Sequence, residues 1–387
     1  MRICYFADGR SVHTKRWISF FARSGHEMHL ISFKPMDAEH VTEMEEIGVR
    51  CHGHVGDFHL KKFWLTLKDL QKVRRVLKRE KIDILHSHFL GTNTWFATVS
   101  LFRPHIITVM GGDVKGETWQ PNSNLQERML TPMALKKADV VTVWSNNIGK
   151  IVERYRTKTP AFEWVHGGID LQKFTPAPKP KYLLQRLEIP ETSRIVFSPR
   201  LVRRLYNIDQ IARAAGIVCD KLPDTYFIIA LPTIILDEEY TEEIKTIFAE
   251  NAARERVRFV STIPHHEIAD YFRLADVTVS IPSTDGTPMS VLESMACATP
   301  AVIGDLSDYD ADYFENEKTV LTVDVNNPQS IADAVLRFLS DPDFAKKIAD
   351  ELGIHLVRAS CPNDHPIFVR MMAEVISAQV NAAEDRE

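Results

Sequence analysis

Short apolar runs rich in β-branched residues alternate with helical patterns along nearly all of this 387-residue chain. Such alternation predicts parallel sheets covered by helices, because parallel neighbouring strands need a long crossover connection between them. The runs lack strict apolar–polar alternation, as expected for strands that are buried on both faces. The predicted strands are 2–7, 27–33, 49–52, 82–86, 105–110 and 139–144, followed by 194–198, 225–230, 257–260, 276–281 and 319–323.

A proline-rich stretch at 171–182 separates these two series of strands, with three prolines at alternate positions. Such a stretch continues neither a helix nor a central strand, and it therefore predicts a domain boundary. We predict a Rossmann-like domain over 1–175 and a second over 183–365. The remaining residues, 366–387, form a helical segment for which packing back on the first domain is one arrangement.

Composition and cysteine content indicate a globular protein of a reducing compartment. The chain is 44% hydrophobic and 26% charged, as in ordinary soluble domains. Its five cysteines are odd in number and form no CxxC pair, which favours reduced thiols. The first apolar run is too short for a signal peptide, and no apolar stretch approaches the roughly 18 residues of a membrane span. We expect a cytoplasmic protein.

The net charge of −5 conceals a strong asymmetry. Residues 1–176 carry 26 Lys and Arg against 18 Asp and Glu, whereas the remainder carries 21 against 34. A basic first half and an acidic second half predict different partners for the two halves. Large anions or an anionic membrane surface suit the first half, and no nucleic-acid partner is expected.

Much of the basic charge lies in one predicted helix, residues 61–81, with nine Lys and Arg against Asp69 and Glu80. Its apolar residues recur at spacings of three and four, which predicts one buried face. They are Phe63, Leu67, Leu70, Val73 and Leu77. The helix is either an ordinary solvated helix or a peripheral contact with anionic lipid, with Trp64 near its start.

Residues 283–298 form the strongest candidate site. They follow a predicted buried strand and lead into a helix that we expect to begin at Pro288, with Thr287 as its N-cap. A helix N-terminus at the carboxyl edge of a parallel sheet is suited to bind phosphate. Asp285 precedes this helix, and Glu293 lies among apolar and small residues, where a carboxylate needs a partner such as a ribose hydroxyl. The alternative is a capped core helix with one surface Glu.

A second candidate site, residues 198–209, directly follows the first strand of the second domain and carries Arg200, Arg203 and Arg204. Arginine suits a diphosphate because its guanidinium donates two parallel hydrogen bonds. The alternative is a basic surface loop.

Several other site types are not expected. The first loop contains only Gly9 where a dinucleotide fingerprint needs GxGxxG, and no GxxxxGK[ST] loop occurs, which disfavours NAD and P-loop chemistry. Histidine-rich spots at 51–54 and 264–267 do not supply the four placed ligands typical of zinc, and there is no DxD. We expect neither a metal nor a cofactor.

The pattern within 283–298 resembles the signature of family 4 retaining glycosyltransferases. It consists of an acidic residue, seven intervening positions, a Glu and then Ser-Met-Ala-Cys. The resemblance implies the α/β fold called GT-B, in which two Rossmann-like doubly wound domains face each other across a cleft. It also implies retaining transfer from a nucleotide-diphosphate sugar, the co-substrate, to a saccharide or lipid-linked acceptor. The Asp-Gly-Thr-Pro form is similar to a variant found in cell-surface polysaccharide enzymes.

The resemblance also implies roles for individual residues. Asp285, where the family usually has Glu, would contact the transferred sugar, and Glu293 would bind the ribose. Arg200, joined by Arg204 or Arg203, would neutralise the leaving diphosphate. The backbone between the two acids would hold the sugar hydroxyls and phosphate through Gly286, Thr287, Pro288, Met289 and Ser290.

Residues 8–17 resemble the family's first loop and helix, which face the acceptor and the donor phosphate. Two positions depart from the family pattern. Leu205 stands where a Lys is usual, and Met110 stands where many members have a His. Either Asp113 takes part of that polar role, or the chemistry relies on the donor phosphate alone. The implied acceptor-binding residues are His13, Arg16 and Gly112.

Two other functions remain open at this point. An epimerase acting on a nucleotide sugar uses the same fold, but it needs acid and base groups that the Asp-Gly…Glu signature does not supply. A catalytically degenerate binding subunit is compatible with Met110 and with the missing Lys.

Overall fold

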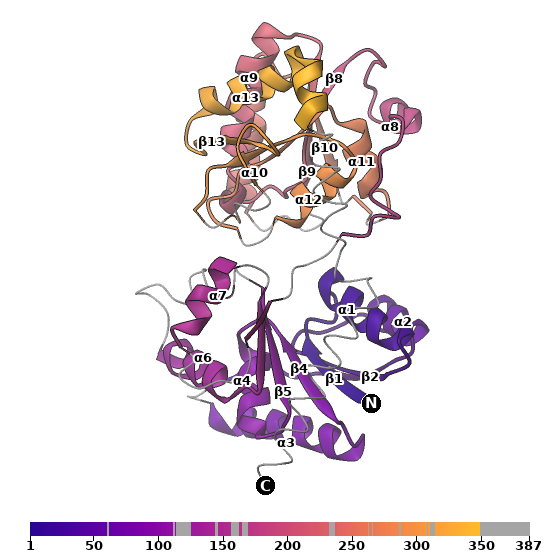
Figure 1. Ribbon diagram of the computed structural model, residues 1–387, viewed down its shortest axis with the longest axis vertical. Helices are drawn as coiled ribbons and strands as arrows, with labels where there is room; N and C mark the ends of the chain where they lie inside the picture. Colours follow the sequence, from indigo (N-terminus) through magenta and orange to yellow (C-terminus); the bar gives the residue numbers. More distant parts are fainter. Residues whose placement is uncertain are drawn as a thin grey trace. The chain divides into compact units, whose positions relative to one another are not determined.

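Two parallel sheets flanked by helices organise the protein (Figure 1). The computed structural model describes residues 1–59, 62–110, 113, 125–143, 146–155, 162–164, 169–231, 237–261, 263–264, 266–285, 288–307, 309 and 314–348. The chain divides into two compact units, the first ending at residue 168 and the second beginning at Ile169. The predicted C-terminal helical segment, 366–387, lies outside the described residues.

The sheet of the first unit has the strand order β3-β2-β1-β4-β5-β6-β7, with all neighbours parallel. Its strands are β1 Arg2–Ala7, β2 Glu27–Ser32, β3 Val49–His54, β4 Ile84–His88, β5 His105–Val109, β6 Val140–Val143 and β7 Phe162–Trp164. The strand order reverses between β1 and β4, because β1 pairs with both β2 and β4.

Helices cover both faces of this first sheet. They are α1 Val12–Arg23, α2 Ala38–Glu46, α3 Phe63–Arg79, α4 Thr92–Ser100, α6 Leu125–Lys137 and α7 Asn146–Glu153. Successive residues of β1 point to opposite faces. Ile3 and Tyr5 join a cluster with Trp17 of α1, whereas Cys4 and Phe6 join one with residues of α3 and α4.

The sheet of the second unit has the order β10-β9-β8-β11-β12-β13, again all parallel. Its strands are β8 Arg194–Ser198, β9 Thr225–Leu231, β10 Val257–Ser261, β11 Val277–Ser280, β12 Ala301–Gly304 and β13 Leu321–Val323. Its helices are α8 Lys181–Arg186, η2 Arg204–Tyr206, α9 Ile208–Lys221, α10 Glu238–Ala249, α11 Ile268–Leu274, α12 Met289–Ala296 and α13 Pro328–Ser340. The order reverses between β8 and β11.

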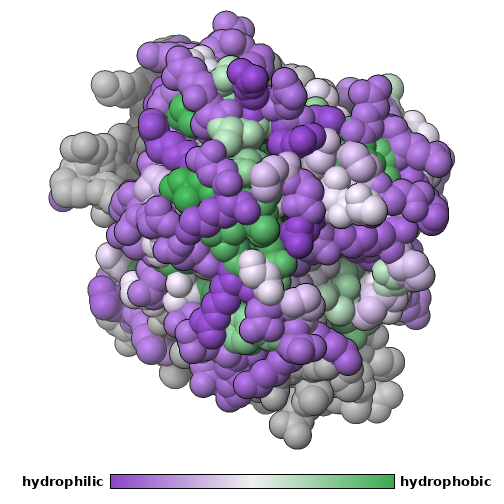
Figure 2. Space-filling model, turned by 90° about the horizontal axis from the view of Figure 1, so that it is seen from above, coloured by the Kyte–Doolittle hydropathy of each residue, from purple (hydrophilic) through white to green (hydrophobic). Residues whose placement is uncertain are grey.

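The surface is mainly polar. Figure 2 shows a face on which hydrophilic residues predominate and hydrophobic residues form a band near its middle. Within the described part of the chain, no helix is both long enough and apolar enough to cross a membrane.

Helix α3 differs from its predicted burial. Val73, Val76 and Leu77 are buried, but Leu67, which we expected in the buried face, is 39% exposed. The reason is geometric: at about 100° per residue, Leu67 lies roughly 120° around the helix from Val73. Beside it, Trp64 is 69% exposed, so the first turns of α3 present apolar side chains to solvent.

The proline-rich segment 171–182 is attached to the second unit. The guanidinium of Arg273 on α11 donates to the carbonyl oxygens of Lys173 and Thr175, at 2.6 and 2.9 Å. Phe174 is buried in the core of this unit. The break between the two units therefore precedes the prolines instead of coinciding with them.

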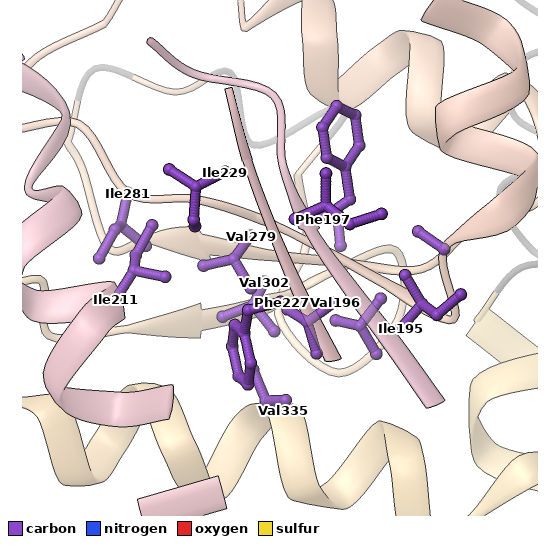
Figure 3. Packing of buried hydrophobic residues seen from close by; sticks show 14 of the residues in the cluster. Ile195, Val196, Phe197, Ile211, Phe227, Ile229, Val279, Ile281, Val302 and Val335 are labelled. Carbon is purple, nitrogen blue, oxygen red and sulfur yellow. The ribbon is translucent and has the colours of Figure 1, made fainter. Parts of the chain in front are cut away.

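The core beneath the second sheet is built from alternating side chains of its central strands. Val196 of β8 is level with Phe227 of β9, and both share the face covered by α9 and α13. Figure 3 shows Phe227 directed toward Val335 of α13. Phe197 points to the opposite face and contacts Phe272 of α11, with ring centroids 5.5 Å apart. This two-sided burial fixes where each strand of the sheet ends.

Most predicted strands are confirmed to within about two residues at each end. Two strands were missed, β7 and β12, and both have only three or four residues. The helix predicted to begin near Pro288 is confirmed, and its first helical residue is Met289. Pro288 has ψ 83°, outside the helical range, and its carbonyl accepts hydrogen bonds from Val291 and Leu292, so it is the cap of α12.

Four of the described histidines are buried in the first sheet: His29, His86, His88 and His105. His86 bonds to Thr108 at 2.7 Å and His105 bonds to Ser87 at 2.8 Å, whereas neither ring nitrogen of His88 has a hydrogen-bond partner in the part of the chain that the structure describes. Burial lowers the pKa of His88 and of His105 to about 3, and lowers the pKa of His86 well below its usual value. The folded unit therefore holds these imidazoles neutral.

This burial predicts that the first unit loses stability in mild acid. Below pH 6.5, the ordinary value, the unfolded chain binds protons at these histidines that the folded unit does not bind. The free energy of unfolding should fall by up to about 1.4 kcal/mol per pH unit for each histidine, from pH 6.5 down toward the folded pKa. Urea unfolding followed by tryptophan fluorescence reports this unit, because all six tryptophans precede residue 169.

The matched variants are His105→Gln, which keeps a polar partner for Ser87, and His266→Gln at a site that is 81% exposed. We expect His105→Gln to flatten the decline in acid and His266→Gln to leave it unchanged. Equal slopes in the two variants would contradict the explanation.

Candidate functional site

The candidate site lies where the second sheet reverses its strand order. β8 pairs with β9 on one side and with β11 on the other. The loops that follow β8 and β11 consequently leave adjacent strands at the same carboxyl edge. Ligands of open α/β sheets bind at such a reversal, because the two loops turn away from each other there.

Arg200, in the loop after β8, is paired with Asp285, in the loop after β11. Its Nε also donates to Ser280 Oγ, at 3.0 Å, and its guanidinium lies 5.1 Å from the ring centroid of Tyr206. The Arg200 and Asp285 side chains are each only 17% exposed. The structure thus joins two of the predicted catalytic residues, and it holds the guanidinium in a defined orientation.

Asn207 ties the same two loops together. Its φ of +50° and ψ of 43° place it in the left-handed region, which asparagine tolerates better than most residues. Its side-chain amide donates to the carbonyl of Ile281 at 2.8 Å, and Ser283 donates its backbone NH to Leu205 at 2.8 Å. The two loops therefore form one connected surface.

The other two candidate arginines differ from each other. Arg204 faces helix α10, with Asp237 3.0 Å and Glu243 3.5 Å from its guanidinium, and it stacks over the ring of Tyr240. Its charge is therefore already balanced by carboxylates. Arg203 is exposed and has no partner among the described residues, so it is the better candidate for a second cation near Arg200.

Helix α12 presents its N-terminus at the same edge. Met289 and Ser290 form its first turn, and both are partly buried. The Ser290 hydroxyl is buried and has no hydrogen-bond partner in the described part of the chain. Glu293 follows one turn later and is also partly buried. Gly286 and Thr287, two further predicted donor-binding residues, lie outside the described residues.

The end of the signature segment has a structural role. The Ser294 hydroxyl bonds to Thr278 Oγ1 of β11 at 2.7 Å and to the carbonyl of Thr299 at 3.0 Å. The Thr299 hydroxyl in turn bonds to the carbonyl of Phe272 at 2.7 Å. These buried contacts fasten α12 to β11 and α11. Part of the pattern in 283–298 therefore serves to position the helix.

In the first unit, His13 and Arg16 lie on α1. Burial and the neighbouring Arg16 lower the pKa of His13 to about 4, so this imidazole is neutral at physiological pH. Gly112 lies outside the described residues. His13 is a hydrogen-bonding group whose state does not change between pH 6 and 8.

Asp113 is buried, and its carboxylate holds two backbone segments. It accepts hydrogen bonds from the backbone NH of Leu90 at 2.8 Å and of Met110 at 3.1 Å. A carboxylate used in this way positions the ends of β4 and β5. This geometry gives Asp113 a positioning role, and the catalytic role expected for it stays a prediction.

Three residues of the site were given no role in the sequence analysis: Ser280, Tyr206 and Asn207. Ser280 and Tyr206 contact Arg200 only because of the tertiary fold, and no sequence signal identifies them. Asn207 had a usable signal, since asparagine is one of the few residues that favour the left-handed conformation at turns and just after a helical turn. Within the described ranges, no group of three or more His, Cys, Asp or Glu is arranged to hold a metal ion.

Comparison with known proteins gives a glycosyltransferase family for each unit. The model of the family "Glycosyl transferases group 1" matches residues 183–351, and that of "Glycosyl transferase 4-like" matches residues 2–146. The chain therefore matches glycosyltransferases over both of its units. The arrangement at the β8–β11 reversal is thus found in a domain of a sugar-transferring family.

The similar proteins agree with this assignment. A D-inositol 3-phosphate glycosyltransferase of Corynebacterium urealyticum is 24% identical over 73% of this chain and 69% of its own length. One from Pseudarthrobacter chlorophenolicus is 22% identical over 87% of this chain and 83% of its own length.

Solved structures confirm the predicted GT-B fold of two Rossmann-like domains. Sucrose-phosphate synthase from Thermosynechococcus elongatus has a TM-score of 0.77 at 17% identity, covering 99% of this chain and all of that one. Anabaena HepE in complex with UDP-glucose has a TM-score of 0.78 at 15% identity, covering 98% of this chain and 100% of that one. At these identities the likeness establishes the fold alone.

The Arg200–Asp285 pair predicts that removal of the negative charge of Asp285 strengthens the binding of an anionic ligand. Asp285→Asn frees the Arg200 guanidinium from its carboxylate, so UDP should bind about tenfold more tightly, which corresponds to about 1.4 kcal/mol. Isothermal titration calorimetry measures this affinity directly.

The control is Glu239→Gln, which removes a carboxylate 3.9 Å from Arg204 at a side chain that is 92% exposed. UDP affinity should not change in this variant. Weaker UDP binding by Asp285→Asn would show that Arg200 does not receive the diphosphate.

Proposed function

We propose that this glycosyltransferase moves a sugar from a nucleotide-diphosphate sugar to a hydroxyl of a saccharide or lipid-linked acceptor, with retention of configuration. The observation that carries the proposal is the fixed guanidinium of Arg200 at the strand reversal, paired with Asp285. A cation held there by Ser280 and Tyr206 suits a diphosphate, and the adjacent carboxylate suits sugar hydroxyls.

Arg200 and the N-terminus of α12 would act on the leaving group. When the bond between the sugar C1 and the diphosphate oxygen breaks, negative charge develops on the diphosphate. Donors that are already oriented toward this charge lower the barrier, because no reorganisation is needed during the reaction. The partly buried position of Arg200 strengthens the effect, since water screens it less.

The residues at the site support sugar transfer with retention of configuration rather than the two-carboxylate mechanism of a glycoside hydrolase. The acceptor oxygen would form the new bond to C1 on the face from which the diphosphate departs, and its proton would pass to a diphosphate oxygen. A pair of flanking carboxylates, as used by glycoside hydrolases, is then unnecessary. Asp285 is paired with Arg200, and we assign its carboxylate to contacts with the sugar hydroxyls beside that guanidinium.

The donor proposed first is a uridine-diphosphate sugar, because UDP-glucose is bound to the structurally similar HepE. The related inositol-phosphate transferases support a cyclic polyol or saccharide as the acceptor, with a role in surface polysaccharide or glycolipid synthesis. A panel of nucleotide sugars identifies the donor by the increase in melting temperature that each causes.

Two substitutions test the site. Arg200→Ala should lower kcat by about a hundredfold, the usual cost of one donor that stabilises developing charge. Glu293→Ala should raise the donor KM by about tenfold through loss of a ribose contact. Both are measured as transfer from the donor that the panel identifies.

Arg213→Ala, on the exposed side of α9, is the control and should match the wild type. Wild-type transfer by both Arg200→Ala and Glu293→Ala would refute the site. Sugar isomerisation without an acceptor would identify an epimerase, and binding without transfer or hydrolysis would identify a degenerate subunit.

We further propose that α3 docks on an anionic membrane, such as the cytoplasmic face that carries lipid-linked acceptors. Trp64, Leu65 and Leu67 are 69%, 45% and 39% exposed in its first turns. Exposed lysines and arginines follow along the same helix. Apolar insertion together with charge attraction of about 1 kcal/mol per basic residue is the combination that peripheral helices use.

Vesicle flotation tests this docking. The wild type should float with phosphatidylglycerol vesicles at low salt, and much less at high salt or with phosphatidylcholine alone. Trp64→Ser should weaken flotation severalfold. Leu171→Ser, at an apolar site that is 39% exposed and lies outside the first unit, should not. Binding that is insensitive to salt, or no binding at all, would exclude the proposal.

A further inference from the structure

Phe89, directly after β4, has an unusual backbone conformation. Its φ is +76°, in the left-handed region that bulky side chains avoid. Both of its backbone polar groups are bonded: its NH donates to Thr108 O at 2.9 Å, and its carbonyl accepts from Thr94 Oγ1 at 2.7 Å. The conformation is therefore imposed by the fold. Non-glycine residues held in this way concentrate at ligand-binding sites.

The packing of the Phe89 ring contributes little stability to offset the cost of this strained backbone conformation. It is 41% exposed, although every residue of β4 before it is buried. Glycine would adopt this φ without strain. A residue that is both strained and exposed is better explained by contact with a ligand than by packing.

Phe89 lies at the strand reversal of the first sheet. The Asn93 amide donates to Phe6 O at 2.8 Å and to His88 O at 2.6 Å, and so holds the ends of β1 and β4 together. The next residue, Leu90, is held by the carboxylate of Asp113. The ring is thus mounted on a fixed part of the carboxyl edge, the edge at which open α/β sheets bind ligands.

The residue before Phe89, His88, carries a buried hydrogen-bonding group that packs against Tyr5, Trp17 and His86. His88 is buried, and neither of its ring nitrogens has a partner among the described residues. An aromatic surface with a few polar groups nearby is the usual composition of a small-molecule site. The exposed Phe89 ring at this edge of the sheet suits the apolar face of an uncharged ring that carries hydroxyl groups.

We propose that Phe89 is a specificity-determining residue, whose ring stacks on the apolar face of a cyclic polyhydroxylated acceptor, a pyranose or a cyclitol. The inference rests on the proposed function, because it assigns the acceptor of that reaction. The C–H groups on one face of such a ring carry partial positive charge, and they complement the negative face of the aromatic ring. The acceptor hydroxyls remain available for polar contacts and for transfer.

The decisive variant is Phe89→Gly, which removes the ring and also relieves the strain. Transfer from UDP-glucose is measured with octyl β-D-glucopyranoside and with D-myo-inositol 3-phosphate as acceptors. We expect the acceptor KM to rise at least tenfold, with the donor KM and donor hydrolysis unchanged and the melting temperature equal or higher. Phe89→Tyr keeps the stacking surface and should stay within about twofold of the wild type.

Leu101→Gly is the matched control, because Leu101 is also exposed and has a φ of +61°, but it ends α4 instead of following β4. Its acceptor KM should not change. The inference would be overturned if Phe89→Gly left the acceptor KM unchanged or raised the donor KM. It would also be overturned if the wild type hydrolysed UDP-glucose but used neither acceptor. Failure of the proposed function is a different result: no binding, hydrolysis or transfer with any nucleotide sugar.

Discussion

The parallel pairing of β8 with β11 is the interaction on which the candidate site depends. These strands are far apart in the sequence, and only their pairing brings the loop of Arg200 beside the loop of Asp285. The pairing is secured by side chains buried on both faces of the sheet, so the site stands on the most rigid part of the second unit. Asn207 then converts the two loops into one surface through hydrogen bonds that neither loop could satisfy alone.

The signature segment combines binding with support. Its first half supplies Asp285 and the N-terminus of α12, which are polar groups available to a ligand. Its second half supplies Ser294, and Thr299 directly follows the segment; the buried hydroxyls of these two residues fix α12 against β11 and α11. Because a buried hydroxyl is costly without a partner, these bonds also fix the position of the helix. The sequence pattern shared with the family therefore includes residues that fix the position of α12 as well as polar groups that are available to a ligand.

The two units use the same architecture for different purposes. At the reversal of the second sheet, charged groups face each other and are suited to an anion. At the reversal of the first, backbone NH groups bind Asp113, and the same edge carries the exposed Phe89 ring, buried imidazoles and the Asp8–Arg10 ion pair directly after β1. We assign the donor diphosphate to the second unit because of the Arg200 guanidinium, and the acceptor to the first unit because of the exposed aromatic ring.

The fold class, most of the strands and the two loops that carry Arg200 and Asp285 could be predicted from the amino-acid sequence alone. The reason is that buried parallel strands leave continuous apolar runs, which can be recognised without a structure. Only the tertiary structure decided which arginine faces the site, since Arg204 is neutralised by carboxylates of α10, more than thirty residues away. It also decided that Asp113 supports loops, that Leu67 is exposed, and that Phe89 is strained. Each of these depends on contacts between segments that are distant in the chain, and spacing along the sequence does not encode such contacts.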